Sequence, residues 1–213
     1  MKKILNAKFI FLLAAIFTII NCSSSVKNEL RNGDLLFVTA KNSGLSGAIN
    51  NVTQKNKDEK FDHIGILEIK NGKFSVLHAS PKKGSNRQNL NDFIKDQKKD
   101  QQNIIIYRMK PEFMKSIPNA LLMADSMLGK PYNFNYILDE NSFYCSDFIE
   151  RAFRKDEIFK LEPMTFIDPK TGETNTFWQN FYDNKNIKVP EGELGCNPNG
   201  LASSDKIMRI KEL

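Results

Sequence analysis

The sequence predicts a domain of mixed strands and helices, with a β-hairpin early and a helix later that carries a cysteine. The clearest element is the hairpin, in which strand-like runs over 63–69 and 74–79 flank Lys70-Asn71-Gly72-Lys73. Asn-Gly is a strong two-residue turn signal, because both residues tolerate the positive φ angles of the tight turn that joins twisted strands. Apolar residues at helical spacing over 148–153 predict a helix that begins near Tyr144.

The other elements follow in chain order from shorter patterns. Gly33-Asp34 introduces an apolar strand over 35–38, and Asp34 is expected to hold the start of that strand rather than to do chemistry. Small and apolar residues over 43–52 predict a short helix. The basic, polar segment 80–102 predicts a connection with one helical turn at 90–94.

Towards the C-terminus the patterns become weaker. Residues 104–107 predict a strand, and a helix is expected over 117–128, since Gly129 suits the left-handed position just past a helix end. From Asp156 onward the sequence predicts irregular structure, apart from a final strand over 206–210.

The first residues have the composition of a secretory leader. Three lysines accompany an apolar run over 9–20, which is too short to span a bilayer as a permanent helix. The run ends at Ile19-Ile20-Asn21-Cys22, which resembles a bacterial lipobox, although Asn21 departs from the usual small residue before the cysteine. We therefore predict a signal peptide over 1–21, a tether over 22–30 that is lipidated at Cys22, and one domain over 31–213.

An ordinary secretory signal or an uncleaved anchor is the alternative, and each places the domain outside the cytoplasm. The predicted location is the cell envelope, and Ser23 favours the outer membrane in a cell that has one. The net charge of +6 includes the three leader lysines, and charges are mixed along the chain, which predicts no nucleic-acid partner. We expect a small-molecule, peptide or lipid substrate, membrane contact through the anchor, and no cofactor.

The two histidines of the chain are predicted to meet on the sheet. If Asn71 and Gly72 form the turn, Lys70 pairs with Lys73, and His63 and His78 project from one face as diagonal neighbours. Their backbones would then lie about 7 Å apart.

Cys145 is expected in the first turn of its helix, where unpaired amide groups and the helix dipole favour the thiolate. A neighbouring imidazole would complete a thiolate–imidazolium pair, and the second histidine would orient the first. Three alternatives remain open at this point. Cys145 could be a small core residue, it could form a disulfide with Cys196, or it could join the histidines at a metal site, although no fourth ligand is evident.

Several motifs, in order, resemble a known family of enzymes. They are similar to motifs of the permuted papain-like amidases of the YiiX and YaeF type. The motifs are Gly33-Asp34-Leu35-Leu36-Phe37, His63-Ile64-Gly65-Ile66, Val76-Leu77-His78-Ala79, Gly129-Lys130-Pro131-Tyr132 and Tyr144-Cys145-Ser146-Asp147. These amidases belong to the NlpC superfamily of cysteine hydrolases. The resemblance implies an α+β, permuted papain-like (NlpC-type) fold, in which a small antiparallel sheet or partial barrel packs against the cysteine-bearing helix.

The resemblance also implies roles for individual residues. Cys145 would be the nucleophile, His63 its base and His78 the third polar residue, while Tyr144 would help to shape the oxyanion site; no metal is implied. The expected function is that of an envelope lipoprotein that acts as a cysteine hydrolase or amidase, or as an acyltransferase, through a thioester. Its substrate would be an amide or ester, such as a cell-wall peptide or an N-acyl or lipid molecule. The alternative is a non-catalytic lipid- or glycan-binding lipoprotein with the same fold.

Overall fold

The computed structural model describes residues 29–42, 44–53 and 59–213, and it divides the chain into two units, 1–31 and 32–213. The predicted signal peptide and Cys22 lie outside the described residues. Within the described part of the chain, no helix is both long enough and apolar enough to cross a membrane.

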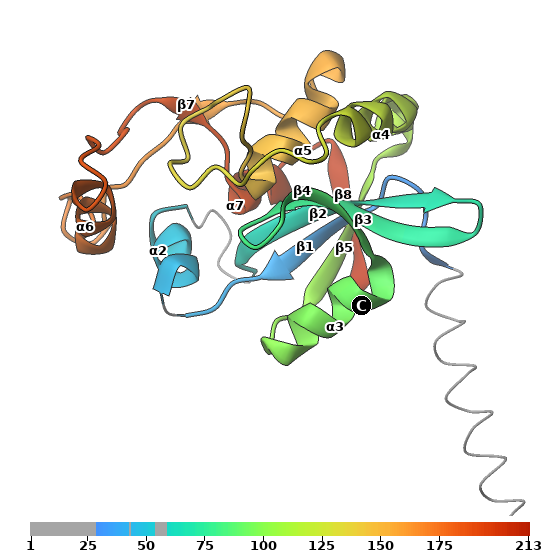
Figure 1. The fold of residues 1–213 in the computed structure, drawn as a ribbon, viewed down its shortest axis with the longest axis horizontal. Helices are drawn as coiled ribbons and strands as arrows, with labels where there is room; N and C mark the ends of the chain where they lie inside the picture. The colour runs from blue at the N-terminus through green and yellow to red at the C-terminus, as the bar shows by residue number, and fades with distance from the viewer. Residues whose placement is uncertain (1–28, 43, 54–58) are drawn as a thin grey trace, which may run out of the picture. The chain divides into compact units, whose positions relative to one another are not determined.

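The second unit is built on a six-stranded antiparallel sheet with the order β4-β3-β2-β1-β5-β8 (Figure 1). Its strands are β1 (Leu35–Thr39), β2 (Phe61–Lys70), β3 (Lys73–Ser80), β4 (Gly84–Asn89), β5 (Ile104–Met109) and β8 (Ile207–Glu212). A separate pair joins β6 (Glu162–Pro163) to β7 (Leu194–Gly195). The expectation of a small antiparallel sheet is confirmed.

Some of the described helices were expected from the sequence and others were not. They are α2 (Gly44–Thr53), α3 (Leu90–Lys99), α4 (Ile117–Ser126), α5 (Cys145–Phe153), α6 (Thr176–Asp183) and α7 (Pro198–Ala202), with short 3₁₀ turns at Pro111–Ser116 and Arg154–Asp156. The expectation of irregular structure beyond Asp156 is wrong at α6 and α7. Asn175 and Asn197 start these helices, because their side chains accept hydrogen bonds from backbone amides of the first turn.

The expected connection over 80–102 is also wrong, because the segment contains β4 and a three-turn α3, which extends the single helical turn expected at 90–94. β4 pairs with β3 from Ser75↔Asn89 to Ser80↔Gly84. It is one of the two edge strands of the sheet, so polar side chains are tolerated along it and the usual alternation of apolar residues is missing.

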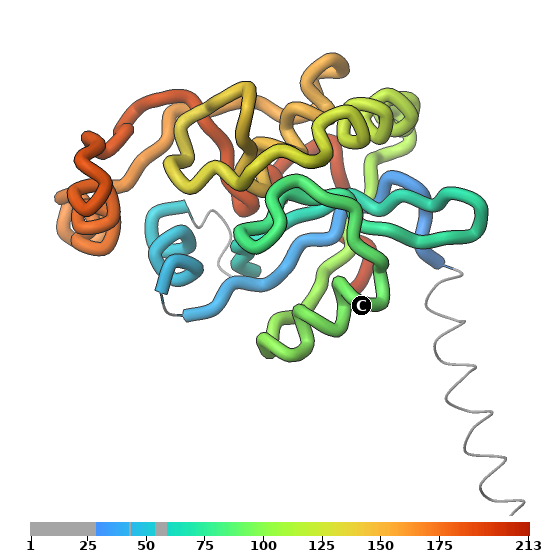
Figure 2. Tube along the Cα trace, viewed as in Figure 1, coloured from blue at the N-terminus to red at the C-terminus, as the bar shows by residue number. Residues whose placement is uncertain are grey.

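The sheet is covered on both faces. One face packs against α4 and α5 in a core that includes Phe37, Ile64, Leu77, Cys145 and Phe148. The other face is covered by α3, whose Phe93 is fully buried. Figure 2 shows α3 on the side of the sheet opposite α4 and α5.

The register of the β2–β3 hairpin is the one predicted from the Asn-Gly turn. Lys70 pairs with Lys73, and Asn71 and Gly72 adopt φ angles of 51° and 71°. The ladder between β2 and β3 ends at Ile66↔Leu77, whereas β2 continues along β1 to Phe61. The candidate site lies where the two strands stop pairing.

Asp34 pairs with Arg108 of β5 through two hydrogen bonds, of 2.7 and 2.8 Å, from the guanidinium to the carboxylate. Both residues are buried, and the Asp34 carbonyl also accepts a hydrogen bond from the Leu67 amide. This geometry agrees with the structural role expected of Asp34.

Candidate active site

Cys145 is the first residue of α5, and Tyr144 precedes it in an extended conformation. The Cys145 Sγ atom lies 3.8 Å from the carbonyl oxygen of Asp62 and close to the backbone amide of Ile64. These two groups flank His63 in the chain. The nucleophile candidate therefore rests on the stretch of β2 that carries the candidate base.

The low pKa predicted for the Cys145 thiol is wrong in this structure. Burial raises its pKa to about 12, and the negative charge of Asp62 adds to the increase. The backbone amides of Ser146 and Ile64 act in the opposite direction, as expected at a helix start, but they are outweighed by burial. The thiol is therefore protonated at neutral pH.

His63 and His78 meet as the hairpin register predicted. The Nε2 atom of His63 and the Nδ1 atom of His78 lie 2.7 Å apart, and Phe93 of α3 packs against both rings. Burial lowers the pKa of His78 to about 4 and lowers the pKa of His63 well below its ordinary value, with the charge of His78 as a further cause for His63. Both imidazoles are neutral at pH 7.

A chain of hydrogen bonds determines which ring nitrogen of each histidine carries the proton. Asp96 accepts a bond of 2.7 Å from the Gln88 Nε2 atom, so the Gln88 oxygen is directed towards His78. That oxygen lies 3.1 Å from His78 Nε2 and can only accept, so the His78 proton is on Nε2. His78 Nδ1 must then accept from His63 Nε2. His63 is left with an unprotonated Nδ1, which is the nitrogen that a general base needs.

Gln88 and Asp96 were missed at the sequence level. They lie on β4 and α3, in the segment that was predicted as a connection, and no local pattern distinguishes them. Within the described residues, no hydrogen bond joins the Cys145 thiol to either imidazole. The structure brings the two histidines together on the α3 face of the sheet, against Phe93, but it places Cys145 in the core on the α5 face, so the predicted thiolate–imidazolium pair is not formed.

The oxyanion role expected of Tyr144 is not supported, because its side chain points elsewhere. The Tyr144 hydroxyl accepts a hydrogen bond of 3.3 Å from the Cys196 backbone amide and lies 3.9 Å from the Cys196 Sγ atom. The hydroxyl of Tyr132 lies instead at the Cys145 backbone amide and within reach of the thiol. The sequence contained a signal for Tyr132, since it belongs to the motif Gly129-Lys130-Pro131-Tyr132.

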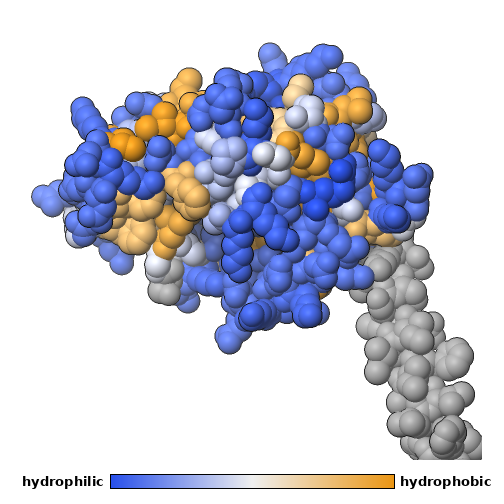
Figure 3. Space-filling model, in the orientation of Figure 1, coloured by the Kyte–Doolittle hydropathy of each residue, from blue (hydrophilic) through white to orange (hydrophobic). Residues whose placement is uncertain are grey.

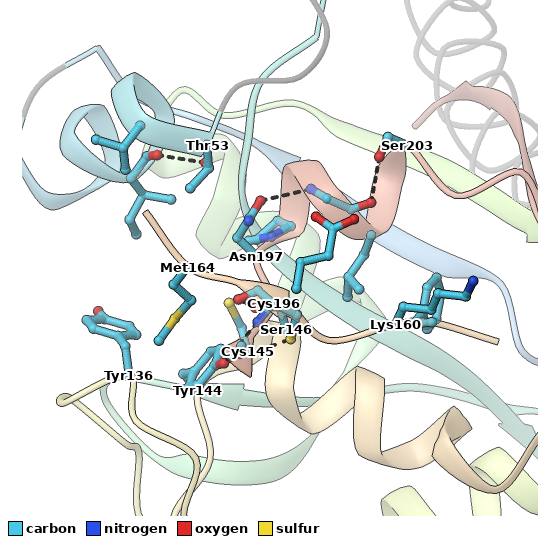
Figure 4. Close-up of a pocket in the computed structure, with 18 of the residues that line it drawn as sticks. Thr53, Tyr136, Tyr144, Cys145, Ser146, Lys160, Met164, Cys196, Asn197 and Ser203 are labelled. Carbon is cyan, nitrogen blue, oxygen red and sulfur yellow. Dashed lines mark hydrogen bonds between the residues drawn. The ribbon is translucent and has the colours of Figure 1, made fainter. Parts of the chain in front are cut away.

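A cavity of about 450 Å³ opens beside the thiol (Figure 4). Cys145, Tyr132 and Asp62 line it together with apolar side chains from α2, α6 and the segment between α5 and α6, namely Ile49, Val52, Phe159, Met164, Phe166 and Trp178. The face shown in Figure 3 carries apolar side chains in the region of α2, α6 and β7, the elements that supply these walls.

Cys145 and Cys196 both line the cavity as free thiols. That they form no disulfide in the mature protein stays a prediction. In the part of the chain that the structure describes, no three His, Cys, Asp or Glu side chains form a group that could hold a metal ion.

Residues 29–211 match the family described as permuted papain-like amidase enzyme, YaeF/YiiX, C92 family. The chain belongs to this family. The fold of this C92 protein is similar to that in the crystal structure of the metalloprotein yiiX from Escherichia coli O157:H7, with 19% sequence identity and a TM-score of 0.68. The likeness covers 86% of this chain and 97% of the other, and at this identity it concerns the fold. No curated protein matches the chain.

The predicted family and the permuted papain-like fold are therefore confirmed. Membership also supports the predicted class of activity, that of a cysteine hydrolase or amidase. The individual roles of Cys145, His63 and His78 are predictions, and they are taken up as part of the proposal below.

Proposed function

We propose that this C92 protein hydrolyses an amide or ester through a thioester on Cys145, with His63 as the general base. The observation that carries the proposal is the position of Cys145 at the start of α5 on the wall of a cavity, in a chain of the amidase family. The hydrogen-bond chain from Asp96 through Gln88 and His78 leaves the His63 Nδ1 atom unprotonated. Because His63 packs on the α3 face of the sheet and Cys145 on the α5 face, the proton transfer requires the imidazole to move towards the thiol. A neutral thiol and a neutral imidazole can react if the proton moves as the sulfur attacks.

In the acylation step the Cys145 Sγ atom attacks the carbonyl carbon while its proton passes to His63 Nδ1. The carbonyl π electrons move to the oxygen, and the Cys145 amide and the Tyr132 hydroxyl are placed to stabilise the negative charge that develops there. Collapse of this intermediate breaks the bond to the leaving group, which takes the proton from His63. Water, deprotonated by His63, then cleaves the thioester to release the acid and the free thiol.

The lining of the cavity supports a substrate with an apolar acyl part. Aromatic and aliphatic side chains of α2, α6 and the segment 158–166 surround the space next to the thiol, and burial of apolar area is the main source of affinity in such a pocket. A lipid or N-acyl group and the side chain of a cell-wall peptide both meet this requirement. Transfer of the acyl group to an acceptor other than water would use the same thioester.

We further propose that the protein is held in the cell envelope by a lipid on Cys22, as the lipobox-like sequence indicates. Replacing Cys22 by Ala should move the full-length protein from the membrane fraction to the soluble fraction of the envelope. A Ser23→Ala variant serves as the matched control and should stay in the membrane fraction. Membrane association that survives Cys22→Ala would contradict the lipid anchor.

The hydrolase proposal is tested with p-nitrophenyl octanoate, which releases a coloured product when its acyl group is transferred. The expected result is an octanoyl adduct on the peptide that contains Cys145, removed by neutral hydroxylamine as a thioester would be. Cys145→Ala should show neither the adduct nor the turnover above background. If the wild-type protein binds the ester in the cavity but forms no adduct at Cys145, the non-catalytic binding protein becomes the better description.

A further inference from the structure

The chain enters the second unit between the β2–β3 hairpin and the start of α4. The Asn32 side-chain oxygen accepts a hydrogen bond of 2.7 Å from the Ile69 amide, one residue before the end of β2. Gly33 lies against Ile117, the first residue of α4, so closely that a Cβ atom at Gly33 would come within 2.4 Å of the Ile117 side chain. We call the β2–β3 turn and residues 111–123, which flank this point, the entry end.

The entry end lies close to the proposed lipid anchor and far from the cavity. Asn32 follows Cys22 by ten residues, and a chain of that length spans at most about 35 Å. From Ile69 at the entry end, β2 runs to Asp62, which lines the cavity. These two residues are seven positions apart, which corresponds to about 23 Å along a strand. A lipid on Cys22 would therefore bring a bilayer within reach of the entry end first.

The entry end carries apolar side chains that the fold leaves exposed. Met114 of the 3₁₀ turn and Leu122 and Met123 of α4 are 40, 72 and 39% exposed, and Pro118 is exposed as well. Met114, Pro118 and Leu122 follow one another at intervals of four residues, so they lie along one side of this helical segment. Among the large apolar residues that the structure describes, none is more exposed than Leu122. Neighbouring exposed apolar side chains of this kind mark a contact with a protein or a membrane.

Lysines border these apolar side chains. Lys70 and Lys73 flank the β2–β3 turn and Lys115 precedes α4; all three are exposed, and none forms an ion pair with another described residue. Glu112 is the one acidic residue in the sequence of the entry end, which leaves a net charge of +2. Apolar side chains surrounded by lysines suit the headgroup region of a bilayer that contains anionic lipids.

The cavity end is less suited to an anionic surface, although it also exposes apolar atoms. Figure 1 shows α4 and the β2–β3 turn at one end of this unit and α2 and α6 at the other. Phe177 of α6 and Leu194 of β7 are 37 and 54% exposed. Residues 158–195, which include both, contain six acidic residues and four lysines, a net charge of −2. An anionic bilayer would repel this end and attract the entry end.

We propose that the entry end rests on the surface of an anionic phospholipid bilayer, with the side chains of Met114, Leu122 and Met123 among the headgroups and the three lysines near the phosphates. This inference rests on the lipid anchor proposed above. The contact orients the domain, so the cavity opens towards the aqueous envelope at about the length of β2 from the headgroups. A substrate that arrives from solution is therefore favoured over a lipid of the same bilayer.

Tryptophan fluorescence of the full-length protein, isolated from the membrane fraction and reconstituted in vesicles, shows which end touches the bilayer. Trp178, the only tryptophan of the sequence, is buried at the cavity end. Leu122→Trp adds a reporter at the entry end, and Phe177→Trp, the matched control, adds one at an exposed apolar position of α6. The vesicles contain phosphatidylglycerol and a phosphatidylcholine brominated near the headgroup, which quenches tryptophan on contact. Leu122→Trp should lose emission relative to vesicles without bromine, whereas Phe177→Trp and the wild type should not.

The role of the lysines is tested in the Leu122→Trp protein. A lysine near an anionic bilayer surface favours the docked state about fivefold, so Lys70→Gln should lower the ratio of docked to undocked protein by about that factor. Lys98→Gln is the matched control, because Lys98 is an exposed lysine on α3, outside the entry end, and its replacement should leave the quenching unchanged.

The proposal is overturned if Leu122→Trp is quenched no more than Phe177→Trp, since the entry end would then not be the end in contact with the bilayer. Equal effects of Lys70→Gln and Lys98→Gln would also overturn it. Failure of the lipid anchor is a different result: Cys22→Ala would stay in the membrane fraction, while the quenching of Leu122→Trp would persist. Failure of the hydrolase proposal would remove the octanoyl adduct on Cys145 and leave the quenching unchanged.

Discussion

The Nε2 atom of His63 lies 2.7 Å from the Nδ1 atom of His78, and the direction of that hydrogen bond is determined by a carboxylate that touches neither ring. Asp96 orients the Gln88 amide, the Gln88 oxygen places the His78 proton on Nε2, and His78 Nδ1 is left to accept from His63. The consequence is a His63 whose free lone pair is on Nδ1. The predictions for His63, His78 and Gln88 depend on this arrangement, and the prediction for the alkylation of Cys145 depends on the neutral thiol.

Replacing His63 by Ala should reduce kcat/KM for p-nitrophenyl octanoate by about 10²–10⁴-fold, because in the proposed mechanism the His63 imidazole takes the thiol proton. His78→Gln is the comparison variant and should cost less, since a glutamine oxygen or a water molecule can still accept from His63 Nε2. Steady-state kinetics of the two variants at pH 7.5 measures whether the loss of kcat/KM is larger for His63→Ala than for His78→Gln. Equal losses would mean that the two histidines do not have separate roles.

Gln88→Glu should move the acid limb of the pH profile of kcat/KM to higher pH. The wild-type base is neutral above the lowered pKa values of His78, about 4, and His63, so activity is lost only as the pH falls through them. A carboxylate next to His78 stabilises the imidazolium and raises these pKa values, so the loss begins at a higher pH. Gln88→Met, which adds no charge, should lower activity at all pH values without this upward shift.

Alkylation of Cys145 by iodoacetamide should be slow at pH 7 and should accelerate continuously up to pH 10, because burial and Asp62 hold the thiol pKa near 12. Asp62→Asn removes the negative charge and should increase the rate at pH 9. The rate is measured by mass spectrometry of the peptide that contains Cys145. A rate that is already constant between pH 6 and pH 8 would show that a preformed thiolate exists after all.

Tyr132→Phe should lower kcat about 10²-fold, the usual cost of one lost oxyanion donor, with a smaller change in KM. Its comparison variant is Tyr144→Phe, which removes a hydroxyl that contacts Cys196 instead, and it should lower kcat less. Single-turnover kinetics of acylation separates this effect from product release. A larger kcat loss for Tyr144→Phe would restore Tyr144 to the oxyanion role that the sequence suggested.

Arg108→Met should destabilise the fold by about 3–5 kcal/mol, because it leaves the Asp34 carboxylate buried without its bidentate partner. The double variant Asp34→Leu with Arg108→Met should recover part of this loss. Urea denaturation of the three proteins provides the free energies of unfolding. A loss below about 1 kcal/mol for Arg108→Met would mean that water reaches the carboxylate.

The sequence by itself determined the features that depend on local chemistry. The Asn71-Gly72 turn set the hairpin register, because the side-chain period of a strand is two residues, and this register brought His63 and His78 to one face. The spacing of apolar residues located α5 and placed Cys145 at its start. Motif order indicated the permuted papain-like family, which the match over residues 29–211 confirmed.

Only the tertiary structure decided the protonation states of the candidate site residues and which side chains surround them. The polar edge strand β4 and helix α3 supply Gln88 and Asp96, and their role depends on contacts between elements that no local pattern encodes. The pKa of Cys145 follows from a balance between a helix start, which favours the thiolate, and burial, which favours the thiol. Burial wins because it reflects every group packed around the sulfur, and that packing exists only once the chain has folded.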